Sequence, residues 1–202
     1  MDIQVLIYDK FCDFEVTVAL SWMNKQNIVT IGLEDRKFIS ESKFTVTPDL
    51  TISEAIPGDA DLLIIPGGTP GKYIKSIDGE NVELLFHHIR SLDRKGKLLG
   101  AICGGPEFLA LAGVLKGKRI THGLDDQSHP SFDGAIYVDE PLVVDGNIIT
   151  AKGNAFIEFG LVLMDLLDLF ESEEERQNDI DWLLQSGNLG ISSRPHTVGD
   201  RD

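Results

Sequence analysis

Residues 97–113 read KLLGAICGGPEFLALAG. The apolar run that ends at Ile102 predicts a buried strand, and residues 107–112 predict a helix. Between them lies Cys103, at a turn rich in glycine. A strand, a nucleophilic side chain at a sharp turn and a helix are together typical of a nucleophile elbow, here with Cys in place of Ser. A lone cysteine is more often an inert buried residue, but this context favours Cys103 as a nucleophile.

Two further properties of this turn bear on its chemistry. The start of a helix favours a thiolate through its dipole and its free N–H groups, so we expect a lowered pKa for Cys103. A second glycine loop, IIPGG at residues 64–68, ends another predicted strand at the same sheet edge. The backbone N–H groups of Gly68 and Gly104 are therefore predicted to form an oxyanion hole.

The rest of the chain alternates predicted strands and helices, which indicates an α/β fold with a parallel sheet. Asp13 is predicted to cap a helix, and Asn154 to cap another that runs to about residue 170. His87 and His88 are expected on the outer face of their helix, and Asp145-Gly146 predicts a hairpin turn. The predicted strands cover residues 3–8, 28–32, 61–65, 97–102, 119–121, 135–138, 142–144 and 148–150, the predicted helices cover 13–26, 80–93, 107–112 and 155–170, and a polar hairpin covers 37–47.

The C-terminal part differs in composition from the rest. We expect an α/β domain over residues 1–170, followed by an acidic helical extension and tail over 171–202 that begins with ESEEER. A short amphipathic helix around Ile180 and Leu184 and a frayed end from about residue 192 are predicted. The extension is either a docked helix with a disordered end, or a lid or oligomer contact.

Charge and composition exclude several classes of protein. The chain has 202 residues with 18 Lys plus Arg against 33 Asp plus Glu, a formal net charge of −15. Such a surface argues against nucleic acid and anionic membranes as partners. The start MDIQVLIYDK lacks the features of a signal peptide, no stretch has the length of a membrane helix, and two cysteines suggest a reducing compartment. We therefore expect a cytoplasmic protein.

Several motifs together resemble the DJ-1/PfpI superfamily of class I glutamine-amidotransferase-like folds. They are AICGGP at 101–106, IIPGG at 64–68, DFE at 13–15, VDGNIITAKG at 144–153 and the segments around Leu109 and Thr121. The resemblance covers about residues 1–170. It implies a flavodoxin-like three-layer sandwich with a mostly parallel central sheet, and a homodimer. The spacings of His, Cys and acidic residues do not suggest a metal site, and we expect a chemistry that needs no cofactor. The resemblance also implies Cys103 as nucleophile, Glu15 as the carboxyl that hydrogen-bonds it, and His122 as a general acid or base.

One departure from the resemblance narrows the function. The protease-like branch places His directly after the nucleophile, but Gly104 stands there, which puts a Cys–His–acid triad in doubt.

Cys12, close to Glu15 in sequence, is either a half-buried free thiol or a redox partner that resolves an oxidised Cys103 as a disulfide.

Two functions stay open. The first is a cysteine-dependent enzyme acting on a small carbonyl or amide substrate, by glyoxalase III- or deglycase-like chemistry, amide hydrolysis or hydration. The second is an oxidant-sensing, stress-protective, chaperone-like dimer that uses Cys103 oxidation.

Overall fold

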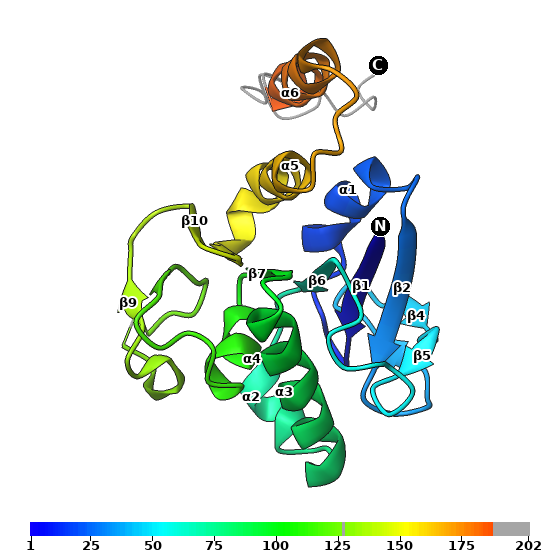
Figure 1. The fold of residues 1–202 in the computed structure, drawn as a ribbon, viewed down its shortest axis with the longest axis vertical. Helices are drawn as coiled ribbons and strands as arrows, with labels where there is room; N and C mark the ends of the chain where they lie inside the picture. Colours follow the sequence, from blue (N-terminus) through cyan, green and yellow to red (C-terminus); the bar gives the residue numbers. More distant parts are fainter. Residues whose placement is uncertain (127, 188–202) are drawn as a thin grey trace, which may run out of the picture. The chain divides into compact units, whose positions relative to one another are not determined.

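The computed structural model describes residues 1–126 and 128–187. The chain separates into a compact unit, Met1–Leu167, and a second unit that begins at Asp168. The first unit is built on one seven-stranded sheet with the strand order β10-β11-β7-β6-β1-β2-β5 (Figure 1). All neighbouring strands in it are parallel except β10 and β11, which form the predicted hairpin.

The central strands are short apolar runs that are buried on both faces, as expected for a parallel sheet covered by helices. Their bounds are β1 Asp2–Ile7, β2 Asn27–Gly32, β5 Leu50–Thr51, β6 Leu62–Ile65, β7 Leu98–Ile102, β10 Leu142–Asp145 and β11 Ile148–Ala151. Register pairs Ile65 of β6 with Ala101 of β7, and Ile102 with Ala151 of β11. The carboxyl ends of β6, β7 and β11 therefore meet at one edge, where Cys103 begins the turn.

Helices cover both faces of the sheet, which gives three layers (Figure 1). The alternation of side chains along β7 shows this directly. Gly100 faces Phe159 and Leu163 of α5, whereas Leu99 and Ala101 belong to the core on the other face. The helices are α1 Phe14–Trp22 and α5 Phe156–Leu166 on one face, and α2 Pro70–Ile74, α3 Gly79–Arg94 and α4 Pro106–Leu111 on the other. The predicted three-layer α/β sandwich is confirmed.

Two small sheets lie outside the main one. The predicted polar hairpin is formed by β3 Phe38–Ile39 and β4 Thr45–Val46. A parallel pair is formed by β8 Arg119–Ile120 and β9 Ile136–Tyr137, joined through the 3₁₀ turn η1, Pro130–Phe132.

Four predictions about helix ends and caps were wrong. The first helix ends at Trp22 rather than near residue 26, and Asp13 makes no capping bond because its carboxylate accepts the Ser42 N–H instead. Asn154 lies inside a 3₁₀ turn, η2 Gly153–Ala155, and does not cap α5. That helix ends at Leu166, and Asp168 then adopts a φ of +53°, which stops helical backbone.

His88 corrects another prediction, since it is buried rather than on the outer face of α3. Its Nδ1 accepts the Gly58 N–H at 3.3 Å, and its Nε2 lies 2.6 Å from Oε1 of Gln4. Burial lowers the pKa of His88 to about 4, so the ring is neutral at pH 7. It therefore ties α3 to β1 as a polar core contact.

The second unit contains α6, Glu173–Gly187, whose first turn carries Glu173, Glu174 and Glu175. A helix is thus present where the sequence predicted one. The predicted frayed end from residue 192 lies outside the described residues. Among the helices of the described part, none is both long and apolar enough to cross a bilayer.

Candidate active site

Cys103 lies at the turn between β7 and α4. Its backbone has a conformation that few residues other than glycine adopt. Its φ is +59°. The conformation is held from both sides, because the Cys103 N–H donates to the Ala151 carbonyl at 2.8 Å and the Cys103 carbonyl accepts the Gly123 N–H at 2.7 Å. The side chain is half-buried. Strain of this kind, fixed by neighbouring strands, is typical of a nucleophile elbow.

Three glycines from three strand ends surround the sulfur. Gly67 follows β6, Gly123 follows β8 and Gly153 follows β11. A Cβ atom added to them would lie 3.1, 3.1 and 3.2 Å from Sγ, respectively. Because these residues are glycines, no Cβ atom occupies the space beside the sulfur, and a ligand atom can approach the thiol there. The sequence analysis did not single out Gly123 and Gly153, although both follow predicted strands.

Glu15 reaches the thiol from the first turn of α1. It is only 2% exposed, and its Oε2 accepts the Gly67 N–H at 2.8 Å. The carboxyl group also lies beside the Cys103 thiol, since a Cβ on Gly67 or Gly153 would be close to both. Burial raises the pKa of Glu15 above its ordinary value, and its interactions with Cys103 and Gly67 offset only part of that effect. A carboxylate with a raised pKa is a better proton acceptor than a solvated one.

The pKa of Cys103 is raised, whereas the sequence predicted a lowered pKa. Burial, together with the neighbouring Glu15 carboxylate, raises it to about 12, while the Gly104 N–H acts in the other direction. The helix that follows has only six residues, so its dipole is too small to reverse the effect. Cys103 and Glu15 therefore form a coupled pair in which burial raises the pKa of each group.

Gly68 and Gly104, the predicted oxyanion donors, lie against each other. A Cβ on Gly104 would come within 2.5 Å of the Gly68 carbonyl oxygen. The Gly104 N–H faces the Cys103 sulfur. Within the described residues, neither N–H donates to a backbone carbonyl. Their role as an oxyanion hole stays a prediction that this placement permits.

His122 follows β8 and is buried, with 2% exposure. Its ring stacks on Phe132 at 4.3 Å between centroids and lies 5.0 Å from the Tyr137 ring. Its Nδ1 accepts the Leu124 N–H at 3.2 Å, which places the proton of a neutral imidazole on Nε2. The next residue, Gly123, touches Cys103 through the backbone. The role of His122 as an acid or base stays a prediction.

Cys12 lies in the loop before α1 and is 8% exposed. Its thiol donates to Oε2 of Glu41 at 2.9 Å, and its N–H donates to the Gly67 carbonyl at 2.9 Å. Burial and Glu41 raise its pKa well above the ordinary value. The predicted disulfide with Cys103 remains untested, and both thiols are free here.

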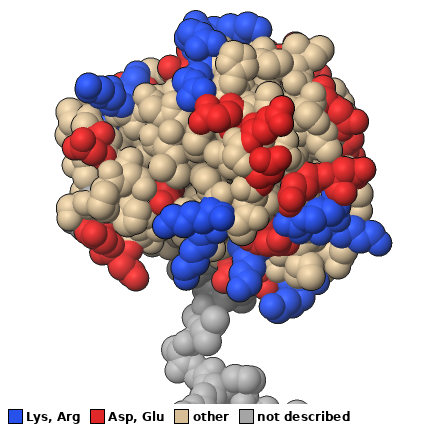
Figure 2. Space-filling model, turned by 90° about the horizontal axis from the view of Figure 1, so that it is seen from below, with Lys and Arg blue, Asp and Glu red and all other residues tan. Residues whose placement is uncertain are grey.

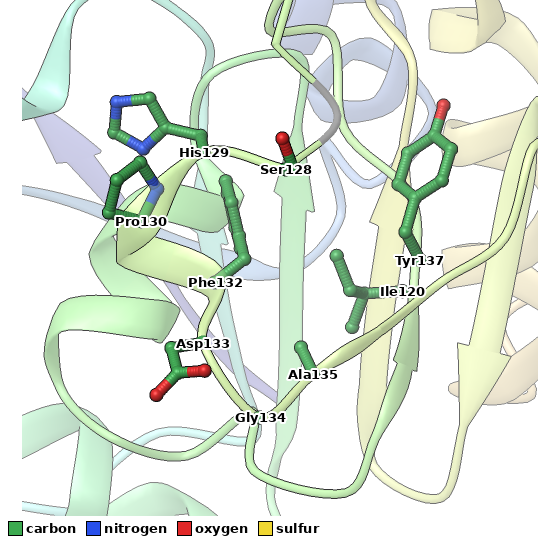
Figure 3. A pocket seen from close by; sticks show the side chains of 9 residues that line it. All are labelled: Ile120, Ser128, His129, Pro130, Phe132, Asp133, Gly134, Ala135 and Tyr137. Atoms are coloured by element: carbon green, nitrogen blue, oxygen red, sulfur yellow. The ribbon is translucent and has the colours of Figure 1, made fainter.

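Two cavities adjoin the site. One of about 560 Å³ lies between η1 and the β8–β9 pair, with Phe132 on one side and Tyr137 on the other (Figure 3). These are the two rings that hold His122. The second, of about 520 Å³, is lined by Gly68, by residues of α2 and α4, and by Leu124, Asp125, Asp126, His129 and Ser131. It is the cavity that continues from the predicted oxyanion loop.

Fold and site together define a class: α/β sandwich proteins with a cysteine elbow and a carboxyl partner. The sequence matches the DJ-1/PfpI family over residues 1–166. The chain belongs to this family.

Individual relatives span most of the chain. Protein DJ-1alpha of Drosophila melanogaster is 33% identical over 181 residues, which are 84% of this chain and 79% of the relative. Protein/nucleic acid deglycase 2 of Escherichia coli is 33% identical over 155 residues, 74% of this chain and 87% of the relative. The crystal structure of the DJ-1 superfamily protein Atu0886 from Agrobacterium tumefaciens superimposes with a TM-score of 0.76 at 26% identity, covering 92% of this chain and 99% of that one.

Proposed function

We propose that the protein is a cysteine-dependent enzyme that converts a small carbonyl compound, by chemistry of the glyoxalase III or deglycase type. One observation carries the proposal: the Cys103 thiol lies beside the buried Glu15 carboxyl group, with Gly67, Gly123 and Gly153 around the sulfur. Nucleophile, proton acceptor and room for a small substrate are thus combined at one point. Several relatives are named deglycases, which supports this type of reaction.

The first step uses the proton of the Cys103 thiol. As Sγ of Cys103 bonds to an aldehyde carbon, its proton passes to Glu15, and the carbonyl electrons move onto the oxygen, which faces the N–H groups of Gly68 and Gly104. Glu15 then returns the proton to that oxygen, which gives a neutral hemithioacetal. The raised pKa of Glu15 suits both transfers, because its acid and base forms are close in energy.

With a 2-oxoaldehyde the reaction continues without any external oxidant. Glu15 removes the hydrogen of the former aldehyde carbon as a proton, a proton is delivered to the adjacent carbon, and the hydroxyl proton of the first carbon passes to the oxygen of the second. The product is a 2-hydroxyacyl thioester of Cys103. Water then cleaves the thioester, releasing a 2-hydroxy acid and restoring the thiol. His122 is our candidate for the proton delivery, since it precedes Gly123 at the sulfur.

Amide hydrolysis and hydration would use the same nucleophile. Peptide hydrolysis is the least favoured version, because Gly104 occupies the place where a protease-like relative has histidine. The glycines around Sγ leave room for a few atoms rather than for an extended chain.

Incubation with methylglyoxal tests the proposal. NMR should show lactate formed by the wild-type protein and by Cys12→Ser, but not by Cys103→Ser. Equal rates for wild type and Cys103→Ser would refute it.

Oxidant sensing by Cys103 is the second candidate, and the Glu15 contact favours it. A carboxyl beside the sulfur can donate a hydrogen bond to an oxidised sulfinate. Intact-mass spectrometry after graded peroxide would support sensing if Cys103 alone gained about 32 Da, the mass of two oxygens. Simultaneous oxidation of Cys12 would count against it.

We also propose a homodimer that recognises only small-molecule substrates and neither nucleic acid nor membranes. Light scattering coupled to gel filtration gives its mass, and a monomer at every concentration would refute the dimer.

A further inference from the structure

The cavity that Gly68 lines lies next to the Cys103 turn and is our candidate for the space into which a substrate bound at Cys103 extends. Gly68 contributes to its wall and also contacts Gly104, the neighbour of the nucleophile. Gly123, the exposed glycine beside the sulfur, precedes Leu124, which lines the same cavity. The groups that line this cavity therefore decide which substituents a substrate can carry.

Glu107 is the most buried charged group of that cavity, with 7% exposure. Its Oε2 accepts the Gly71 N–H at 2.9 Å, and its Oε1 accepts the Ser131 hydroxyl at 3.1 Å. Both partners are neutral donors, so no cation compensates the carboxylate through these bonds. Two exposed aspartates, Asp125 and Asp126, add to the negative side.

The positively charged residues of the cavity, unlike Glu107, are exposed to solvent. Lys72 and Lys75 line it, but both side chains are exposed. Solvent and salt screen exposed charges far more strongly than buried ones. The buried Glu107 therefore outweighs the two lysines in the field that a ligand experiences inside the cavity.

The ionisable groups around Cys103 are acidic, like Glu107. The Glu15 carboxyl contacts the thiol, and Glu41 is near enough to act on both Cys103 and Glu15. On the face drawn in Figure 2, Lys and Arg side chains are interspersed with acidic ones. The acidic groups beside the nucleophile are therefore a local feature to be considered in addition to the net charge.

We propose that this site selects its electrophile by charge, with Glu107 as a specificity-determining residue that favours neutral or ammonium-bearing carbonyl compounds and disfavours anionic ones. The inference rests on the proposed function. An aldehyde with a neighbouring amino group would place its ammonium near Glu107, whereas the carboxylate of a 2-oxo acid would be repelled.

Methanethiosulfonate reagents of different charge test this inference without any turnover. The cationic aminoethyl and the anionic sulfonatoethyl reagents both form a disulfide with a thiolate and release methanesulfinate. Their rate ratio on one cysteine therefore does not depend on its pKa. The measurement is made in Cys12→Ser, whose hydroxyl can still donate to Glu41, with the ratio normalised to that of 2-mercaptoethanol.

We expect the cationic reagent to be favoured by about tenfold or more at Cys103, and Glu107→Gln to reduce that preference about fivefold. Glutamine keeps the Gly71 and Ser131 contacts, since its oxygen can accept one and its amide can donate to the other. Glu83→Gln, on the exposed surface of α3, changes net charge equally and should leave the ratio unchanged.

Absence of a cationic preference, or a preference that Glu107→Gln leaves unchanged, would overturn the inference. Asp125→Asn provides a second variant if Glu107→Gln does not fold, and it should reduce the preference less. Failure of the proposed enzyme function would instead appear as a lack of methylglyoxal turnover, which these probes do not measure.

Discussion

The two cysteines of this protein are both paired with a glutamate, yet their surroundings differ in the features that matter for reactivity. The Cys12 thiol donates to Glu41, and the Glu15 carboxyl group lies beside the Cys103 thiol. Burial and the neighbouring carboxylate raise the pKa of both. By the thiol–carboxylate contact alone, the two would be indistinguishable.

Space and backbone geometry separate them. Cys103 has a φ of +59° and glycines around its sulfur, whereas Cys12 lies in ordinary backbone and is almost fully buried. The two glutamates differ in exposure: Glu15, beside the more accessible cysteine, is buried, whereas Glu41 is exposed. We therefore expect the reactivity of Cys103 to depend on access to the sulfur and on Glu15 as a desolvated proton acceptor.

Replacement of the two cysteines should give the largest difference in activity. Cys103→Ala should reduce the turnover of methylglyoxal by about a thousandfold or more, since it removes the nucleophile. Cys12→Ala should change it by less than about twofold. Initial rates at saturating substrate measure both, and a comparable loss in the two variants would contradict the assignment.

Filling the space at the sulfur should have the next largest effect. Gly153→Ala would place a Cβ 2.8 Å from Oε1 of Glu15 and 3.2 Å from Sγ of Cys103. We expect kcat to fall about a hundredfold, because misplacement of reacting groups by about 1 Å has that effect. Gly79→Ala is the matched control, since a Cβ there meets no atom within 4 Å. Unchanged kcat in Gly153→Ala would show that a glycine beside the sulfur is not needed at this position.

The two glutamates should differ less, but in a defined direction. Glu41→Gln should alter kcat/KM by less than about threefold, because an exposed carboxylate acts on Cys103 only at a distance. Glu15→Gln should lower it by about a hundredfold, since the proton acceptor is lost. Circular dichroism confirms folding of each variant. Equal losses would place the acceptor at Glu41 instead.

Substitution by glycine should change stability with opposite signs at the two cysteines. Cys103→Gly relieves a side chain from left-handed backbone and should raise the free energy of unfolding by about 1 kcal/mol. Cys12→Gly loses a hydrogen bond and gains backbone freedom, so it should lower that free energy by about 1–2 kcal/mol. Urea denaturation measures both, and a destabilised Cys103→Gly would remove the evidence for strain.

Local patterns were sufficient to predict much of this architecture. Apolar runs closed by Pro66 or Cys103 gave the central strands, because a strand buried on both faces has to be continuously apolar. Caps were predicted less well: Asp13 and Asn154 have suitable side chains, but tertiary partners and a 3₁₀ turn decide their roles. His88 was misplaced because its partners, Gln4 and Gly58, are distant in the chain.

The candidate site shows the same limit. Cys103 and Glu15 were found through a local turn motif and a resemblance, and the structure places them in contact. The raised pKa of Cys103 depends on burial and on how far α4 extends, neither of which can be read from a motif. Gly123 and Gly153 matter only because three separate strands end beside one sulfur.

The pH dependence of Cys103 alkylation tests the central claim most directly, the claim that Cys103 and Glu15 form a coupled pair. Iodoacetamide rates are measured in Cys12→Ser, with and without Glu15→Gln, and modified peptides are identified by mass. Since the carboxylate raises the pKa of the thiol, Glu15→Gln should shift the midpoint to lower pH by about 1–3 pH units. A midpoint that stays in place or rises in Glu15→Gln would contradict the account.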